Sequence, residues 1–178
     1  DMELDPDAPQ DVWERAAELI HESWRAKADP DNPANVPFKE LDDFRKQSNR
    51  RQLLNALRMV EELGGQSWNS LEQTGSVTTL PEDFFEMESQ QQFETLGFGK
   101  ETVARMLETE HEDWRRYHLD ADWVYDKKRN DSRRQHDKLL PWAELIEQRP
   151  DYKEDSLRSL AATLINLRFL GYRSVPKS

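Results

Sequence analysis

The sequence predicts a mainly α-helical fold with short β-strands (α+β), built from two pseudo-symmetric helical repeats. Large apolar side chains recur at three- and four-residue spacing in several stretches, as they do along the buried face of a helix. Three short motifs occur twice in the same order, which indicates an internal duplication. Composition typical of strands is limited to short runs, so we expect strands only near 123–125 and 172–175.

Two helices are expected in the first half of the chain. The first covers about 11–28 and stops in the Pro- and Asp-rich stretch 28–35. A cap at Asn49 is expected to start the second helix, and the glycines at 64–65 are expected to end it. Residues 66–80 are expected to form a loop.

Three longer helices and a charged loop are expected in the second half. A proline suited to a first helical turn starts a helix over 81–96. A strongly periodic helix follows over about 100–118. Beyond it we expect a charged loop over 126–138, a helical turn near 140–142, and a final helix over about 155–170.

These elements divide the chain into four parts. Residues 1–10 are acidic and interrupted by proline, and we expect them to form a disordered lead-in. The first repeat covers 11–66, a linker with one bridging helix covers 67–98, and the second repeat covers 99–175. Each repeat alone is too short for a robust core, so we expect the two to pack together.

The duplication is supported by three pairs of motifs. Their order is the same in both halves, and the offset between partners grows from 90 to 107 residues. The second copy has therefore gained residues, mainly within 120–138. The pairs are His21-Glu22-Ser23-Trp24-Arg25 with His111-Glu112-Asp113-Trp114-Arg115, Val36-Pro37-Phe38 with Leu140-Pro141-Trp142, and Leu63-Gly64 with Leu170-Gly171.

Composition argues against several kinds of partner and site. The 178 residues carry a net charge of -11, which repels nucleic acids and anionic membranes, so neither is an expected partner. The absence of cysteine excludes disulfides, cysteine-based zinc sites and thiol nucleophiles, and it fits a cytoplasmic protein. The first residue is Asp1, so we expect the chain to be a piece of a parent protein with further domains.

The motif order in the second copy resembles the ryanodine-receptor repeat, the RyR domain. The shared pattern is His-Glu-x-Trp, Trp-x-Tyr, a basic loop, His-x-x-Leu-x-Pro-aromatic-x-x-Leu, and a helix that ends in Leu-Gly-Tyr. The chain departs from it at Asp122 and Asp126, where the family often has glycine. The first copy lacks the Trp-x-Tyr run and the basic loop and is similar to a shorter variant of prokaryotic RyR-type proteins that carries Ser-Asn-Arg, here Ser48-Asn49-Arg50. The matching residues of the second copy are His111, Trp114, Trp123, Tyr125, Lys127, His136, Leu139, Pro141, Trp142, Leu145, Gly171 and Tyr172.

The resemblance implies a sensor module. Outside the animal calcium channel, RyR domains look like regulatory modules attached to nucleotide-centred systems and to ion-channel regulatory domains, with adenine nucleotides as suspected ligands. In the channel, the loop between the Trp-x-Tyr run and the last helix is a phosphorylation site. For this chain the resemblance implies no resident cofactor and an adenine-nucleotide-type ligand.

The two His-Glu-x-Trp helices are the first candidate binding elements. His111 and Trp114, like His21 and Trp24, are three residues apart and share a helix face. The indole could stack on a base while the imidazole contacts a phosphate. Alternatively, the tryptophans anchor the core and the histidines satisfy buried partners. A zinc protease needs a second His four positions after the first, and arginine stands there in both copies, so no metal site is expected.

The basic loop is the second candidate. Residues 127–138 hold six cations against two anions, a net +4 in an acidic chain. Beside Trp123 and Tyr125 they suit a phosphate with an attached ring, because arginine binds phosphate in a bidentate manner and aromatic rings stack. The alternative is a solvated loop that pairs with acidic neighbours. The expected main site consists of His111, Trp114, Trp123, Tyr125, Arg133, Arg134 and His136.

A weaker site is expected in the first copy. Asn49-Arg50-Arg51 would start a helix, where backbone N–H groups and arginines favour an anion. The alternative is an ordinary cap with exposed arginines. The residues of this site would be His21, Trp24, Asn49 and Arg50.

Catalysis has little support in the sequence. No carboxylate lies in an apolar run that would raise its pKa, and neither a phosphate-binding glycine loop nor a Gly-x-Ser-x-Gly elbow is present. We therefore expect a non-catalytic regulatory module that binds a nucleotide-like or small anionic ligand. The alternative is a protein–protein interaction scaffold, which full burial of Trp114 and Trp123 without a cleft between the repeats would favour.

Overall fold

A computed structural model describes residues 12–68, 80–170 and 172–177, with side chains from residue 14 onward. Within these residues the fold is mainly helical with a few short strands, as predicted. The expected lead-in over 1–10, most of the expected loop over 66–80, and Gly171 lie outside the described residues. The elements are α1 (Val12–Arg25), η1 (Phe38–Glu40), α2 (Asp43–Glu62), β1 (Gln66–Trp68), η3 (Phe84–Glu86), α3 (Ser89–Thr95), α4 (Lys100–Asp120), β2 (Val124–Tyr125), η4 (Asp131–Arg133), β3 (Gln135–His136), α5 (Trp142–Gln148), α6 (Asp151–Phe169) and β4 (Ser174–Pro176).

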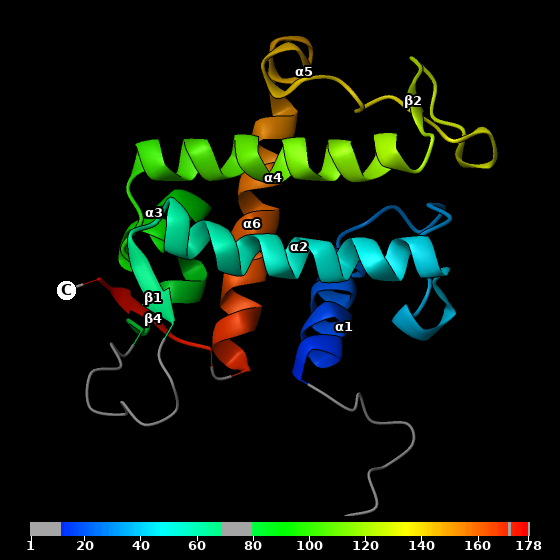
Figure 1. Cartoon of the computed structure of the whole chain (residues 1–178). Coiled ribbons are helices and arrows are strands. Elements are labelled where there is room, and N and C mark those ends of the chain that lie inside the picture. Colours follow the sequence, from blue (N-terminus) through cyan, green and yellow to red (C-terminus); the bar gives the residue numbers. More distant parts are fainter. Residues whose placement is uncertain (1–11, 69–79, 171, 178) are drawn as a thin grey trace, which may run out of the picture.

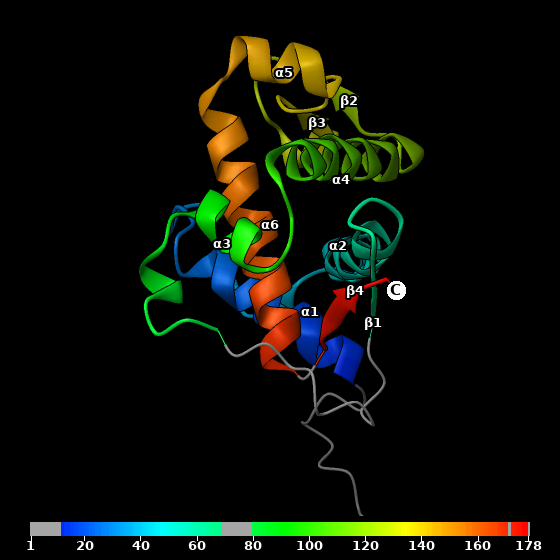
Figure 2. The same ribbon diagram turned by 90° about the vertical axis from the view of Figure 1, so that its left-hand side faces the viewer.

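The four long helices interlock across the two halves of the chain. α4 lies alongside α2, while α1 and α6 run across them (Figures 1 and 2). α1 contacts both α2 and α6, and α4 likewise contacts both α2 and α6. One apolar core therefore takes side chains from both halves, among them Ile20, Leu53, Met106 and Leu164.

A two-stranded ribbon joins the ends of α2 and α6. β1 and β4 pair antiparallel, with Gln66 opposite Pro176 and Trp68 opposite Ser174 (Figure 1). The strand expected near 172–175 is thus present, but the expectation of a loop from residue 66 is wrong for 66–68. A strand of three residues is too short to give a clear sequence pattern. Its partner strand also lies more than a hundred residues further along the chain.

The start of α2 differs from the prediction. The helix begins at Asp43, because the carboxylate of Asp42 accepts a hydrogen bond from Arg45 N at 2.8 Å and caps the first turn. Asn49 and Arg50 therefore lie inside the helix, and the expectation that a helix starts at Asn49 is wrong. The N–H groups of residues this far into a helix are hydrogen-bonded within it.

The bridging segment also differs. The expected single helix over 81–96 is two short pieces, η3 and α3, because Met87 between them has extended backbone angles of φ -70 and ψ 150. Phe84 in η3 is fully buried, and Gln92 in α3 donates to its carbonyl at 3.1 Å. Burial of one aromatic side chain thus sets the path of the linker.

A second ribbon follows α4. The strand expected at 123–125 is present as β2, which pairs in parallel with β3 from the segment expected to be a loop. Two non-glycine residues with positive φ flank this pairing, Asp122 at 66° and Arg134 at 53°. Asp122 is one of the two positions where the resemblance expects glycine, and its left-handed backbone explains that preference.

Replacing Asp122 with glycine is expected to raise the free energy of unfolding by about 0.5 kcal/mol, because glycine takes positive φ without steric cost. Asp122→Val is expected to lower it by about 1–2 kcal/mol. Urea denaturation of both variants measures the difference. Asp126→Gly is the matched control: Asp126 has no positive φ and accepts a hydrogen bond from Lys128 N at 2.9 Å, so glycine there should be destabilising. If Asp126→Gly raised the free energy of unfolding as much as Asp122→Gly does, the positive φ of Asp122 would not explain the effect.

Candidate functional site

The His-Glu-x-Trp motif of α4 binds the backbone of the segment that leads into α5. His111 Nε2 lies 2.7 Å from the carbonyl oxygen of Leu140, so the ring donates a hydrogen bond there. The Glu112 carboxylate accepts from the N–H of Trp142 at 2.9 Å, at the first residue of α5, and pairs with Arg115 at 3.2 Å. The motif therefore attaches the segment before α5 to α4.

The motif of α1 makes the same set of contacts. His21 Nε2 lies 2.6 Å from the carbonyl oxygen of Val36, the Phe38 N–H donates to Glu22 at 3.4 Å, and Glu22 pairs with Arg25 at 3.0 Å. Each His ring stacks on the Trp three residues later, with centroids 5.6 Å apart in both halves. In both halves the histidine thus satisfies a buried partner of its own chain, the alternative that the sequence had left open.

Four of the seven residues of the predicted main site come together in one aromatic cluster: His111, Trp114, Trp123 and His136. His118, which the prediction omitted, is central, with ring centroids 4.3 Å from Trp114 and 5.2 Å from Trp123. Trp114 also contacts His136 at 5.0 Å, edge to face. Trp123 and His136 are 7% and 6% exposed, and Trp114 is half-buried. These rings contact one another between α4 and β3.

Two histidines of this cluster, His118 and His136, have pKa values well below the usual 6.5. Burial, with a smaller effect of Arg51, Arg129 and Arg45, lowers the pKa of His118 to about 4. Burial and the charge of Arg129 lower the pKa of His136 to about 3. The Nδ1 atom of His136 accepts a hydrogen bond from Lys138 N at 3.1 Å, which requires that atom to be unprotonated. His118 and His136 are therefore expected to be uncharged at pH 7 and unsuited to bind a phosphate as cations.

The other three predicted residues lie outside the cluster. Tyr125, Arg133 and Arg134 are exposed on the ribbon, and Arg134 donates to the carbonyl of Ala121 at 3.1 Å. Asp131 in the same loop accepts from Arg129 at 2.7 Å and from Arg45 of α2 at 2.5 Å. Burial would raise the pKa of Asp131, but these two arginines outweigh it and lower that pKa.

An open groove of about 500 Å³ lies on another face, between α2 and α4. Of the predicted residues it includes Arg50, while Asn49 is not among its lining residues. The sequence contained a signal for it, since the α2 residues follow the i, i+3, i+4, i+7 spacing of one helix face. The lining residues are Gln47, Arg50, Arg51, Leu54, Asn55, Arg58, Asp113 and Tyr117.

The three arginines of the groove differ in how fully they are paired. Arg51 bonds Glu110 at 3.0 Å and Asp113 at 2.6 Å, and these carboxylates raise its pKa although burial alone would lower it. Arg50 pairs with Glu14 of α1. Arg58 donates to Asn55 at 2.8 Å and lies 4.0 Å from Asp113, with 55% of its side chain exposed. Arg58 is therefore the least neutralised of the three.

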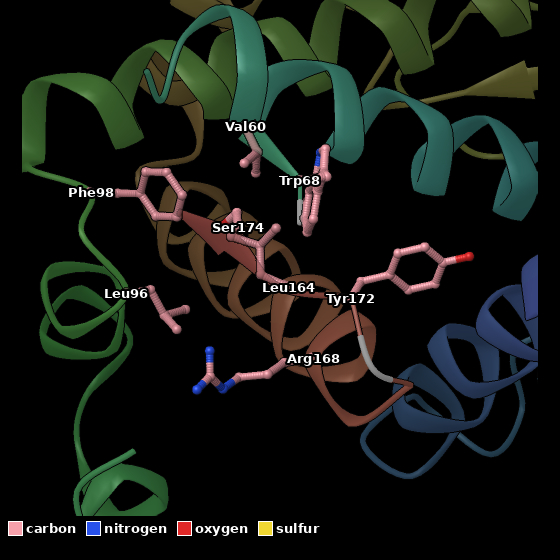
Figure 3. Close-up of a pocket in the computed structure, with 8 residues that line it drawn as sticks. All are labelled: Val60, Trp68, Leu96, Phe98, Leu164, Arg168, Tyr172 and Ser174. Atoms are coloured by element: carbon pink, nitrogen blue, oxygen red, sulfur yellow. The ribbon is translucent and has the colours of Figure 1, made fainter. Parts of the chain in front are cut away.

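A second hollow between the two halves has a mixed polar and apolar lining and is too small for a ligand. It has about 20 Å³ of free space, enough for one water molecule. Figure 3 shows Trp68, Phe98 and Leu164 around it, with Arg168 at its edge. Trp68 Nε1 donates to the carbonyl of Leu57 at 3.0 Å, so this indole belongs to the core.

Among the residues that the structure describes, no three His, Asp or Glu side chains are placed to hold a metal ion. In the same residues, no helix has the length and apolar character needed to cross a membrane.

Comparison with known proteins adds one match. No curated protein matches the chain. The sequence resemblance drawn from the second copy is nevertheless confirmed for that half. Residues 97–173, from the turn before α4 to the end of α6 and just beyond it, match the family model of the RyR domain, and this part of the chain is similar to that family.

Proposed function

We propose that the chain is a non-catalytic regulatory module that binds a small anionic molecule in the groove between α2 and α4. The observation that supports this proposal is the gathering of three arginines in one open groove of a chain with net charge -11. The match to the RyR domain supports the coarser part, a regulatory or interaction role.

The chemistry of the groove suits a phosphate with an attached organic group. Its volume of about 500 Å³ lies within the usual range for small-molecule sites. The guanidinium of Arg58 is exposed and could bind a phosphate in a bidentate manner. Leu54 is 57% exposed, and with Tyr117 it offers an apolar surface to a sugar or base. An adenine nucleotide is therefore one ligand class to test.

This location differs from the main site expected from the sequence. The rings of the aromatic cluster contact one another, and the low pKa values of His118 and His136 favour their uncharged forms at pH 7. The groove instead combines Arg50 of the first half with Asp113 and Tyr117 of the second. We propose that these halves are tandem copies of one repeat, supported by their equal His, Glu and Trp contacts.

Two further points are proposals of the same kind. We propose that the module regulates other domains of a parent protein, because the second half matches a domain family. We also propose a cytoplasmic location, since a chain without cysteine gains nothing from an oxidising compartment.

Isothermal titration calorimetry with ATP, AMP, cyclic AMP, ADP-ribose and inorganic phosphate tests the groove. At least one organic phosphate is expected to bind, and Arg58→Ala should weaken it about tenfold or more, the effect of losing a charge-assisted hydrogen bond. Arg158→Ala is the matched control, because Arg158 is 59% exposed on α6 and also pairs with a nearby carboxylate. No heat and no thermal stabilisation at millimolar ligand would refute the proposal.

The interaction scaffold remains the second candidate. Trp123 is buried as that hypothesis requires, but Trp114 is only half-buried and a groove opens between α2 and α4. The exposed side chains of the β2–β3 segment are the observation in its favour.

A further inference from the structure

We infer that the ribbon formed by residues 124–136 is a docking surface for an extended acidic peptide of a partner protein. This inference is independent of the anion groove, because the ribbon and the groove share no residue. It rests on an open strand edge, on exposed apolar side chains, and on charge.

Among the residues that the structure describes, no strand neighbours the outer edge of β2. The N–H groups of Val124 and Asp126 donate to the carbonyls of Arg134 at 2.9 Å and His136 at 3.3 Å. Since successive residues of a strand point their backbone groups in opposite directions, the N–H and C=O of Tyr125 point to the other edge. In the described part of the chain these two groups have no hydrogen-bond partner. A peptide strand could bond to them by adding itself to the edge.

The inner strand is already paired on both sides. β3 pairs with β2, and Gln135 exchanges two backbone hydrogen bonds with Asn130, each at 2.9 Å. The edge of β2 is therefore the side at which this small sheet can grow. Beside that edge, Val124 and Tyr125 are 52% and 40% exposed and offer apolar contacts to an added strand.

Residues 124–136 carry five cations against Asp126 and Asp131, a net charge of +3, with exposed Asp122 just before them. Lys127, Lys128, Arg133 and Arg134 are all exposed, whereas Asp131 is neutralised by Arg129 and Arg45. The ribbon is thus a cationic surface on an acidic protein, and opposite charge favours an acidic occupant. The same lysines and arginines disfavour a second copy of this ribbon, because two such edges would bring like charges together.

Contacts within the protein fix the position of the ribbon in the absence of a partner. Trp123 and His136, at the base of β2 and in β3, are buried in the aromatic cluster, and Asp131 is bonded to Arg45 of α2. An edge that is already ordered loses little conformational entropy on binding. A short preformed edge with several cations suits weak, salt-dependent recognition.

Fluorescence anisotropy with a labelled ten-residue peptide of alternating Glu and Thr tests the surface. Binding is expected at low salt, and it should weaken at 150 mM NaCl because exposed charges are screened. A Lys/Thr peptide of the same length should not bind. Lys127→Glu/Lys128→Glu should weaken the acidic peptide at least tenfold. Arg105→Glu/Lys153→Glu, which reverses two exposed cations outside the ribbon, should weaken it far less.

Hydrogen exchange separates strand addition from loose electrostatic contact. The bound peptide should slow exchange of the Tyr125 amide, while Arg58→Ala should leave peptide binding unchanged. Equal binding by Lys127→Glu/Lys128→Glu and the unchanged protein would overturn the inference. So would an unprotected Tyr125 amide or loss of binding in Arg58→Ala, since the peptide would then sit elsewhere. The nucleotide titrations test the groove and the peptide experiments test the ribbon. A negative result for one surface therefore does not contradict the proposal for the other.

Discussion

Replacing Arg51 with alanine is expected to lower the free energy of unfolding by about 3 kcal/mol, the cost of removing one partner from a buried ion network. The Arg51 side chain is 12% exposed and bridges α2 to α4 through Glu110 and Asp113. Without the guanidinium, two partly buried carboxylates would lose the cation they share, and the half-exposed Arg58, 4.0 Å from Asp113, would compensate only weakly. Asn55 would then be the main remaining donor to Glu110, at 3.0 Å.

Chemical denaturation at pH 7 measures this loss. Arg58→Ala on the same helix is the control: its side chain is 55% exposed, so a change of about 0.5 kcal/mol or less is expected. Arg51→Met/Glu110→Gln/Asp113→Asn removes all three charges and should regain most of the stability, because no buried charge is left unpaired. If Arg51→Ala cost less than about 1 kcal/mol, or if the triple variant were worse than the single one, the ion network would not be what joins these helices.

The features that the sequence predicted are those with strong local periodicity or a repeated motif. α4 lies within two residues of its expected bounds at each end, and the strand at 123–125 was placed within one residue. The apolar spacing that predicts α4 and the aromatic run that predicts β2 need no distant partner to be recognised. The order of motifs also identified the half that matches the RyR domain.

The features that the sequence missed depend on contacts between distant residues. β1 exists because it pairs with β4, and α2 starts early because Asp42 is a better placed cap than Asn49. The groove forms because α2 and α4 lie side by side, an arrangement that no local sequence pattern predicts. Local spacing shows which α2 residues share a face, but it does not show which helix they face.

The histidines illustrate why a site is harder to predict than a fold. A His and a Trp three residues apart can bind a base and a phosphate, or they can hold a neighbouring segment in place. The deciding partners are carbonyl oxygens 15 residues after His21 and 29 residues after His111. Those partners are backbone carbonyl oxygens, which every residue has. The sequence therefore does not show which residue will accept the hydrogen bond.

Acid is expected to destabilise the protein by about 5 kcal/mol between pH 6 and pH 4, chiefly through His118 and His136. Their folded pKa values, about 4 and about 3, lie below the unfolded value of 6.5. As pH falls below 6.5, the unfolded chain takes up protons that the folded chain does not. Each histidine therefore costs up to about 1.4 kcal/mol per pH unit, less near pH 6 and less again as the pH approaches its folded pKa.

Protonation is opposed in the folded state by burial and by like charges. Arg51, Arg129 and Arg45 act on His118, and Arg129, Lys138 and His118 act on His136, where Asp137 is the opposing charge. Urea denaturation at half-unit pH steps measures the slope, and His118→Phe/His136→Phe should flatten it because a phenyl ring keeps aromatic contacts without binding a proton. The variant should thus lose less stability than the unchanged protein from pH 6 to 4. An equal loss of stability in the variant and in the unchanged protein would contradict this prediction. The acid sensitivity would then come from carboxylates elsewhere and not from His118 and His136.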